Sequence, residues 1–149
     1  MTASSGRLVG QKHVMPLRVY YEDTDAQGVV YHANYLRYAE RARAEIIRLL
    51  GISQRQLKEE RGLIFTIKRA TIDYRAPARL DDLLEVHTSF VALRAASLVA
   101  DQRIMLEGHL IADIQVHVVM LLLATGRPAR VPPEVMHPLQ RLCQSGTGE

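Results

Sequence analysis

The spacing of apolar residues changes once in the first third of the chain. Over residues 15–22 apolar and polar side chains alternate, which predicts a strand. Over residues 34–50 the apolar side chains recur every three or four positions and share one face of a helix. Residues 23–33 fit neither pattern and contain turn-forming aspartates and a glycine. The pattern therefore predicts a strand, a loop and then a long amphipathic helix.

Capping residues mark the ends of two predicted helices. Asn34 is the expected N-cap of the long helix, because its short side chain can accept from an orphan helical N–H, and Gly51 is the expected stop. A shorter helix is expected to open at Ser53, because Gln56 follows three residues later in a capping-box pattern. Gly62 ends it.

The chain then returns to strand spacing and keeps it to residue 124. Alternation predicts four more strands, over residues 63–74, 83–93, 98–106 and 109–124. Short turns separate them, so neighbouring strands are expected to be antiparallel. The long helix must bury its apolar face against this sheet. The expected class is α+β, with one domain over residues 14–133, a flexible tail over residues 1–13 and a second tail over residues 134–149.

Composition narrows the class of protein. A chain of 149 residues with 48% apolar residues suits one compact domain. The longest apolar run, residues 116–124, is far shorter than a membrane helix, and the N-terminus has no apolar segment typical of a signal peptide. Cys143 is the sole cysteine, which fits a reducing cytoplasm. The net charge of +3 is scattered and does not favour nucleic acid.

The loop over residues 23–33 collects side chains that can do chemistry. Asp23, Asp25 and His32 all precede the start of the long helix. A helix start carries unpaired N–H groups and a partial positive charge. A carboxylate beside such donors can attack a carbonyl, or activate water against it, while the donors hold the carbonyl oxygen.

Two stretches of the sequence resemble a known family. The first is Arg18-Val19, Thr24-Asp25, Gly28-Val29-Val30-Tyr31 and Ala33-Asn34-Tyr35 at fixed spacing, followed by ERAR; the second is YRAPARLDD at residues 74–82. The first resembles the active-site signature of hotdog-fold thioesterases of the 4-hydroxybenzoyl-CoA thioesterase type. Together the two are most similar to the bacterial acyl-CoA thioesterases associated with the tol-pal system.

The resemblance implies a fold, an activity and an assembly. The fold is a five-stranded curved antiparallel sheet wrapped around one long helix and extended by dimerisation. The activity is hydrolysis of acyl-CoA thioesters to free acid and coenzyme A, with no cofactor and no metal. The assembly is a homodimer or homotetramer with the active site at the subunit seam, and acyl carrier protein is a possible partner.

The same resemblance assigns roles within the loop. The catalytic carboxylate falls on Asp25, as nucleophile or as general base toward water, and an assisting histidine falls on His32. Backbone N–H groups near Tyr31 and His32 would hold the carbonyl oxygen. Gly28, Tyr31 and Asn34 are the expected substrate-binding positions, although Tyr31 and Asn34 also shape the loop and the helix start. Gln27 departs from the pattern, because the closer relatives usually carry a second glycine there.

Other interpretations of these residues are weaker. Asp23 is expected to stabilise the turn rather than to react. A calcium loop starting at Asp23 fails, because Gln27 and Asn34 stand where charged ligands are needed. The basic residues that can meet coenzyme A phosphates are Lys68, Arg69, Arg75 and Arg79, with no choice among them. Two alternatives to hydrolysis are a non-catalytic hotdog module that binds acyl groups or acyl carrier protein, and a hotdog dehydratase, whose histidine pair this loop lacks.

Overall fold

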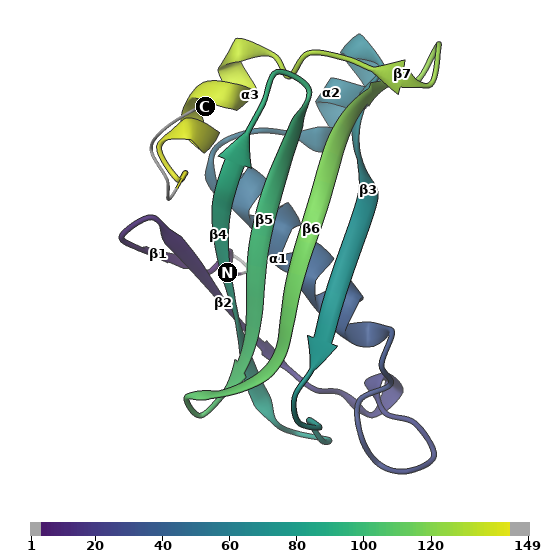
Figure 1. The fold of residues 1–149 in the computed structure, drawn as a ribbon, viewed down its shortest axis with the longest axis vertical. Coiled ribbons are helices and arrows are strands. Elements are labelled where there is room, and N and C mark those ends of the chain that lie inside the picture. The colour runs from purple at the N-terminus through teal and green to yellow at the C-terminus, as the bar shows by residue number, and fades with distance from the viewer. Residues whose placement is uncertain (1–3, 144–149) are drawn as a thin grey trace.

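The chain forms one antiparallel sheet with a long helix lying across one of its faces (Figure 1). The computed structural model describes residues 4–143. The strands are β1 (Arg7–Val9), β2 (Lys12–Arg18), β3 (Leu63–Tyr74), β4 (Leu83–Leu93), β5 (Ser97–Leu106), β6 (His109–Leu122) and β7 (Arg127–Pro128). Their order across the sheet is β1-β2-β4-β5-β6-β3, with β7 paired to β6. The five long strands are the five that the alternation predicts.

Three helices and one short 3-10 turn complete the described chain. They are α1 (Asn34–Leu49), α2 (Gln54–Arg61), α3 (Pro133–Gln140) and the 3-10 turn η1 (Tyr21–Asp23). Gly51 follows the end of α1 in a left-handed conformation, and the Ser53 hydroxyl accepts from the N–H of Gln56, as the capping signals predict. No helix within residues 4–143 is long and apolar enough to span a membrane.

The core lies between α1 and the sheet. One face of α1 buries Tyr38, Ala42 and Ile46, each at most 1% exposed. The sheet contributes alternate residues, and the even-numbered side chains of β6 from Ala112 to Met120 are all buried. This is the burial pattern expected when a helix with one apolar face covers a sheet with one apolar face. The alternation of apolar residues therefore predicts the buried face of β6 correctly.

A row of polar residues crosses this core. His13 of β2 pairs with Thr88 of β4, and Thr88 pairs with Gln102 of β5, so three buried polar side chains lie in one line across the sheet. The Gln102 amide donates to the carbonyl of Ala39 at 2.9 Å and to the Thr88 hydroxyl at 3.0 Å. Its Oε1 accepts from Arg43 at 2.8 Å. The row therefore ties α1 to the centre of the sheet.

The two ends of the domain differ from the expected tails. Residues 7–18 form the β1–β2 hairpin rather than a flexible segment, because β2 pairs with β4 from His13 onward and buries His13 and Val14. Residues 133–140 form α3, whose Val135 and Leu139 enter the core. Residues 1–3 and 144–149 of the expected tails lie outside the described residues.

The first strand ends earlier than the alternation predicts. Strand β2 stops at Arg18, and residues 21–23 turn into η1. The cause is Asp23, whose carboxylate accepts from the N–H of Tyr20 at 2.9 Å and draws the backbone into a tight turn. Alternation alone does not reveal this local competition between side chain and backbone.

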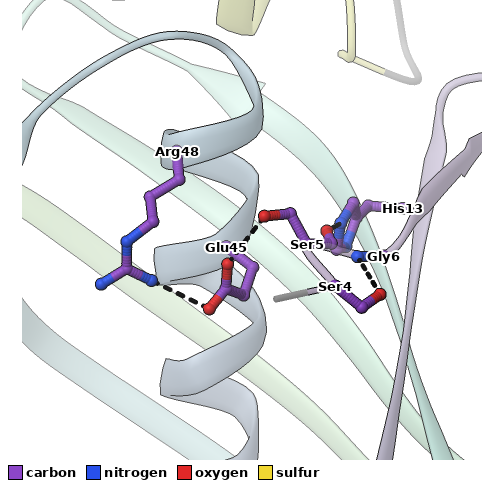
Figure 2. Close-up of polar contacts among 6 residues, drawn as sticks. All are labelled: Ser4, Ser5, Gly6, His13, Glu45 and Arg48. Atoms are coloured by element: carbon purple, nitrogen blue, oxygen red, sulfur yellow. Dashed lines mark hydrogen bonds and ion pairs between the residues drawn. The ribbon is translucent and has the colours of Figure 1, made fainter. Parts of the chain in front are cut away.

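The N-terminal segment is joined to α1 by polar contacts (Figure 2). The Ser5 hydroxyl donates to Glu45 at 2.9 Å, and Arg48 donates to the other oxygen of that carboxylate at 2.9 Å. The His13 ring contacts the Ser5 carbonyl oxygen at 2.6 Å through Nε2, which must carry the hydrogen because a carbonyl only accepts. A Cβ at Gly6 would lie 2.6 Å from the Val14 carbonyl oxygen, so only glycine fits there.

His13 predicts a loss of stability in mild acid. Burial lowers the pKa of the His13 imidazole, against weaker raising effects from Ser5 and Glu45. Protonation would also place a second ring N–H, on Nδ1, where no described residue offers an acceptor. As the pH falls below about 6.5, the unfolded chain binds the proton before the folded chain does. The free energy of unfolding therefore decreases below this pH and keeps its full value above it.

Urea denaturation at pH 7 and pH 5.5 measures this effect. The difference in stability between the two pH values should be smaller in His13→Gln than in the native chain. His117→Gln, which removes a partly exposed histidine on β6, is the matched control and should leave the difference unchanged. An unchanged difference in His13→Gln would assign the acid sensitivity to other groups.

Candidate active site

The loop between η1 and α1 is a tight turn that presents Asp25. The N–H of Gly28 donates to the Asp25 carbonyl at 3.0 Å, which closes a four-residue turn, and Gly28 has φ 82°. The N–H of Asp25 donates to the carbonyl of Val29 at 2.9 Å. One carboxylate oxygen of Asp25 accepts from the N–H of Gln27 at 2.9 Å. The half-buried carboxylate is therefore held by the turn with its second oxygen left available.

Asp23 has a different place in the loop. It is 7% exposed, and its carboxylate accepts from Tyr20. Its backbone carbonyl accepts from the N–H of Tyr31 at 2.9 Å and from the Asn34 side chain at 2.8 Å. Asp23 therefore fastens both ends of the loop to the helix start, which agrees with the structural role predicted for it.

A buried tyrosine of α1 lies near Asp23. Tyr38 and Asp23 line one small polar cavity of about 190 Å³. Burial raises the pKa of the Tyr38 phenol, and the neighbouring Asp23 carboxylate raises it further. The phenol therefore keeps its proton at neutral pH, next to the carboxylate that shapes the loop.

The helix start differs from the prediction in one respect. The N-cap is Ala33, and Asn34 is the first helical residue, because the N–H of Asn34 donates to the Tyr31 carbonyl at 2.8 Å and its side chain donates to Asp23 instead of capping. The N–H of Tyr31 is also occupied by Asp23. Within the loop, the N–H groups of His32 and Ala33 make no backbone hydrogen bond to another described residue, whereas the N–H of Tyr31 does.

His32 lies on the surface between two tyrosines. Its ring centroid is 4.4 Å from that of Tyr31 and 6.4 Å from that of Tyr74, which it meets edge to face. The Tyr74 hydroxyl donates to the His32 carbonyl at 3.1 Å. Tyr74 comes from the end of β3 and is a site residue that the loop motif does not reveal. The second motif, which begins at Tyr74, carried the only signal for it.

The two motifs meet in the structure. The N–H of Val30 donates to the Ala78 carbonyl at 2.8 Å, and Val29 forms an isolated bridge with Arg79. The N–H of Ala78 donates to the Tyr35 hydroxyl at 3.1 Å. Ala78 and Arg79 therefore hold the loop, and Ala78 also joins it to the first turn of α1.

Electrostatics place the Asp25 charge near the first turn of α1. Burial raises the pKa of the Tyr35 phenol, and the charges of Asp82 and Asp25 raise it further. Tyr35 is only 3% exposed and stands in the first turn of α1. The Asp25 carboxylate is therefore one of the charges that act on a phenol in the first turn of α1.

The basic residues weighed for phosphate binding separate into two pairs. Arg75 and Arg79 lie in the segment beside the loop, whereas Lys68 and Arg69 lie at a bulge within β3. All four are exposed. Among residues 4–143 no group of three or more His, Cys, Asp or Glu side chains is placed to share a metal ion.

Comparisons with known proteins agree on one family. The model of the thioesterase-like superfamily matches residues 19–139. A protein of Haemophilus influenzae named acyl-CoA thioesterase YbgC is 45% identical over 120 residues, which cover 80% of this chain and 88% of that protein. Among solved structures, a probable thioesterase from Bartonella henselae has 32% identity and a TM-score of 0.77, over 81% of this chain and 99% of that one.

A further solved structure supports the same fold. A 1,4-dihydroxy-2-naphthoyl-CoA thioesterase from Synechocystis has 25% identity and a TM-score of 0.81, covering 86% of this chain and 95% of that one. The hotdog fold expected from the sequence motifs is confirmed by these likenesses.

Proposed function

This chain belongs to the thioesterase-like superfamily, and we propose that it hydrolyses acyl-CoA thioesters at Asp25. The observation that carries the proposal is the half-buried Asp25 carboxylate, held by its own turn beside the start of α1. The curated relatives named acyl-CoA thioesterase support the substrate class. The site therefore combines a carboxylate with backbone donors, as thioester hydrolysis requires.

The proposed reaction uses two parts of the loop. The N–H groups of His32 and Ala33 hold the thioester oxygen as negative charge develops on it. Asp25 either takes a proton from water, whose oxygen then bonds to the carbonyl carbon, or attacks that carbon directly to form an acyl anhydride. The C–S bond breaks, coenzyme A leaves as a thiolate and takes up a proton, and water releases the free acid from any anhydride. His32 is proposed to orient that water or to donate to the carbonyl.

We further propose that two copies complete the site. β3 is the last strand of the sheet, so no strand within residues 4–143 pairs with its outer edge, and residues 67–71 on it are exposed. Exposed edges favour pairing with a second strand, and a two-fold axis makes such pairing antiparallel. The start of one β3 would then lie beside the end of the other, which carries Tyr74 and contacts the loop.

This pairing would bring a cavity with a partly apolar lining to the loop. A cavity of about 370 Å³ lies between α1 and the start of β3, and its walls include Phe65, Phe90, Leu98 and Val118. We assign the acyl group to this cavity in the second copy. Sedimentation is expected to show a dimer or a tetramer, and a fully active monomer would contradict the shared site.

An acyl-CoA panel tests the proposed function. Purified protein is mixed with saturated acyl-CoAs of increasing length and with aromatic acyl-CoAs, and released thiol is followed with a colorimetric reagent. Hydrolysis of at least one member is expected, and the ranking defines the acyl preference. Binding of acyl-CoA or acyl carrier protein without thiol release would instead support the non-catalytic hotdog module.

Tyr74→Phe should reduce the rate moderately. The change removes the hydroxyl that holds the His32 carbonyl and leaves the ring contacts in place. Loss of one hydrogen bond is worth about 0.5–1.5 kcal/mol, so kcat should fall roughly 2- to 12-fold with little change in KM. Tyr21→Phe alters a tyrosine that is 81% exposed and should have no effect. Equal kcat values for Tyr74→Phe and the native chain would exclude a positioning role.

A further inference from the structure

A second cavity lies at the end of the sheet opposite the loop. It has a volume of about 570 Å³ and separates α3 from the turn that joins β4 to β5. Figure 1 shows α3 and this turn at one end of the molecule and the loop before α1 at the other. The N–H of Val131 donates to the Ala95 carbonyl at 2.8 Å and joins the two walls. The cavity is therefore part of the fold and separate from the proposed active site.

The lining of this cavity combines apolar side chains with polar ones, which are two guanidinium groups, the His137 imidazole and the Gln140 amide. Leu93, Val131 and Met136 provide apolar surface, and Arg94 and Arg130 provide positive charge. Within residues 4–143 neither arginine side chain makes an ion pair, and no carboxylate is among the described residues that line the cavity. Two like charges beside one cavity repel each other, and a bound anion would remove that repulsion.

We propose that this cavity binds the anion of a single-chain fatty acid. The carboxylate would pair with Arg94 and Arg130, since the planar guanidinium matches a carboxylate with two parallel hydrogen bonds. The alkyl chain would cover Leu93, Val131 and Met136. The volume lies in the range of about 300–1,000 Å³ that holds one small ligand. This site does not depend on hydrolysis at Asp25, although the proposed reaction would release such an acid.

Calorimetric titration with sodium dodecanoate below its micellar concentration tests the site. The Asp25→Asn chain is used beside the native chain, so that failure of the proposed catalysis does not affect the result. Both should bind one dodecanoate per chain that a nonhydrolysable acyl-CoA analogue does not displace. Dodecyltrimethylammonium, which has the same alkyl chain and the opposite charge, should bind at least 10-fold more weakly. Equal binding of the two amphiphiles would overturn the proposal.

Substitutions in the cavity lining test where in the fold dodecanoate binds. Arg94→Gln combined with Arg130→Gln should weaken dodecanoate binding at least 10-fold, and Arg94→Gln alone should weaken it less. Met136→Asp puts a negative charge on the apolar wall and should also abolish binding. Arg55→Gln removes an exposed arginine from α2 and is the matched control. Undiminished binding by the folded double variant, or displacement of dodecanoate by a nonhydrolysable acyl-CoA analogue, would overturn the proposal.

A vesicle-binding experiment distinguishes a site for a free fatty acid from a site for a membrane lipid. Vesicles of phosphatidylglycerol are mixed with the native chain and with the double variant, and bound protein is measured after sedimentation. Weak sedimentation that the double variant does not change is expected. Strong sedimentation lost in the double variant, without dodecanoate binding, would assign the arginines to a membrane surface and overturn the proposal.

Discussion

Replacing Asp25 with Asn is expected to lower kcat for acyl-CoA hydrolysis by at least about 100-fold, which is the usual contribution of a general base. Asn cannot accept a proton from water and is a poor nucleophile, so either mechanism fails. Its side-chain oxygen can still accept from the N–H of Gln27, so the turn should keep its shape. KM should change little, because the lost interaction acts mainly in the transition state. Thiol release under saturating substrate measures the effect.

Asp113→Asn provides the matched control for this prediction. Asp113 is a partly exposed carboxylate on β6, about 4.0 Å from Arg103, and belongs to no part of the loop. Its replacement should leave kcat within a factor of two, in line with the small energy of an exposed ion pair. Retention of more than a tenth of the native kcat by folded Asp25→Asn would contradict the assignment.

A rapid-quench experiment separates the two proposed mechanisms. Protein mixed with a slowly hydrolysed acyl-CoA is quenched in acid and its mass measured. An added acyl group that maps to Asp25 identifies the anhydride route, and an unchanged mass throughout the first turnover supports direct attack by water. The structure accommodates both, because one oxygen of Asp25 is held by Gln27 and the other is available.

The sequence predicted the loop and the elements beside it well, because one local pattern determined them. The change from strand spacing to helix spacing located the loop and α1, because each pattern follows directly from the geometry of its element. The reactive carboxylate stays a prediction, but its turn and its place before α1 follow from adjacent residues. Asn34 was wrong as a cap, because Asp23 offered its side chain a better acceptor eleven residues away. Tyr74 was missed for the same reason: its partner, His32, is 42 residues distant.

The ends of the domain were harder to predict, because contacts with distant strands determine their structure. Residues 7–13 are mostly polar, and only the register of β2 with β4 buries His13 opposite Thr88. In α3 a short apolar face between prolines gave no clear helical period. Both segments gain their structure from contacts with distant strands, and local spacing carries no information about such contacts.

Replacing Gln102 with Leu is expected to destabilise the domain by about 3 kcal/mol, although leucine suits a buried strand position. The change leaves two groups without their partner, the Thr88 hydroxyl and the Arg43 guanidinium, and the Ala39 carbonyl loses its second donor while keeping its helical bond. A buried polar group without a partner costs roughly 1–3 kcal/mol. Burial already lowers the pKa of Arg43, which shows how poorly solvated that cation is. The free energy of unfolding in urea measures the loss.

A matched substitution and a double variant show why this loss arises. Gln115→Leu removes an exposed amide from the neighbouring strand, where it donates to Asp101 at 2.9 Å, and should cost less than about 1 kcal/mol. Adding Arg43→Met to Gln102→Leu removes the unpaired cation and should recover part of the stability, because an apolar pair can replace a buried polar one. If Gln102→Leu and Gln115→Leu lower the free energy of unfolding equally, the hydrogen bonds of the polar row contribute nothing to stability beyond the space that its side chains fill. A recovery in the double variant would instead locate the cost at the half-buried charge of Arg43.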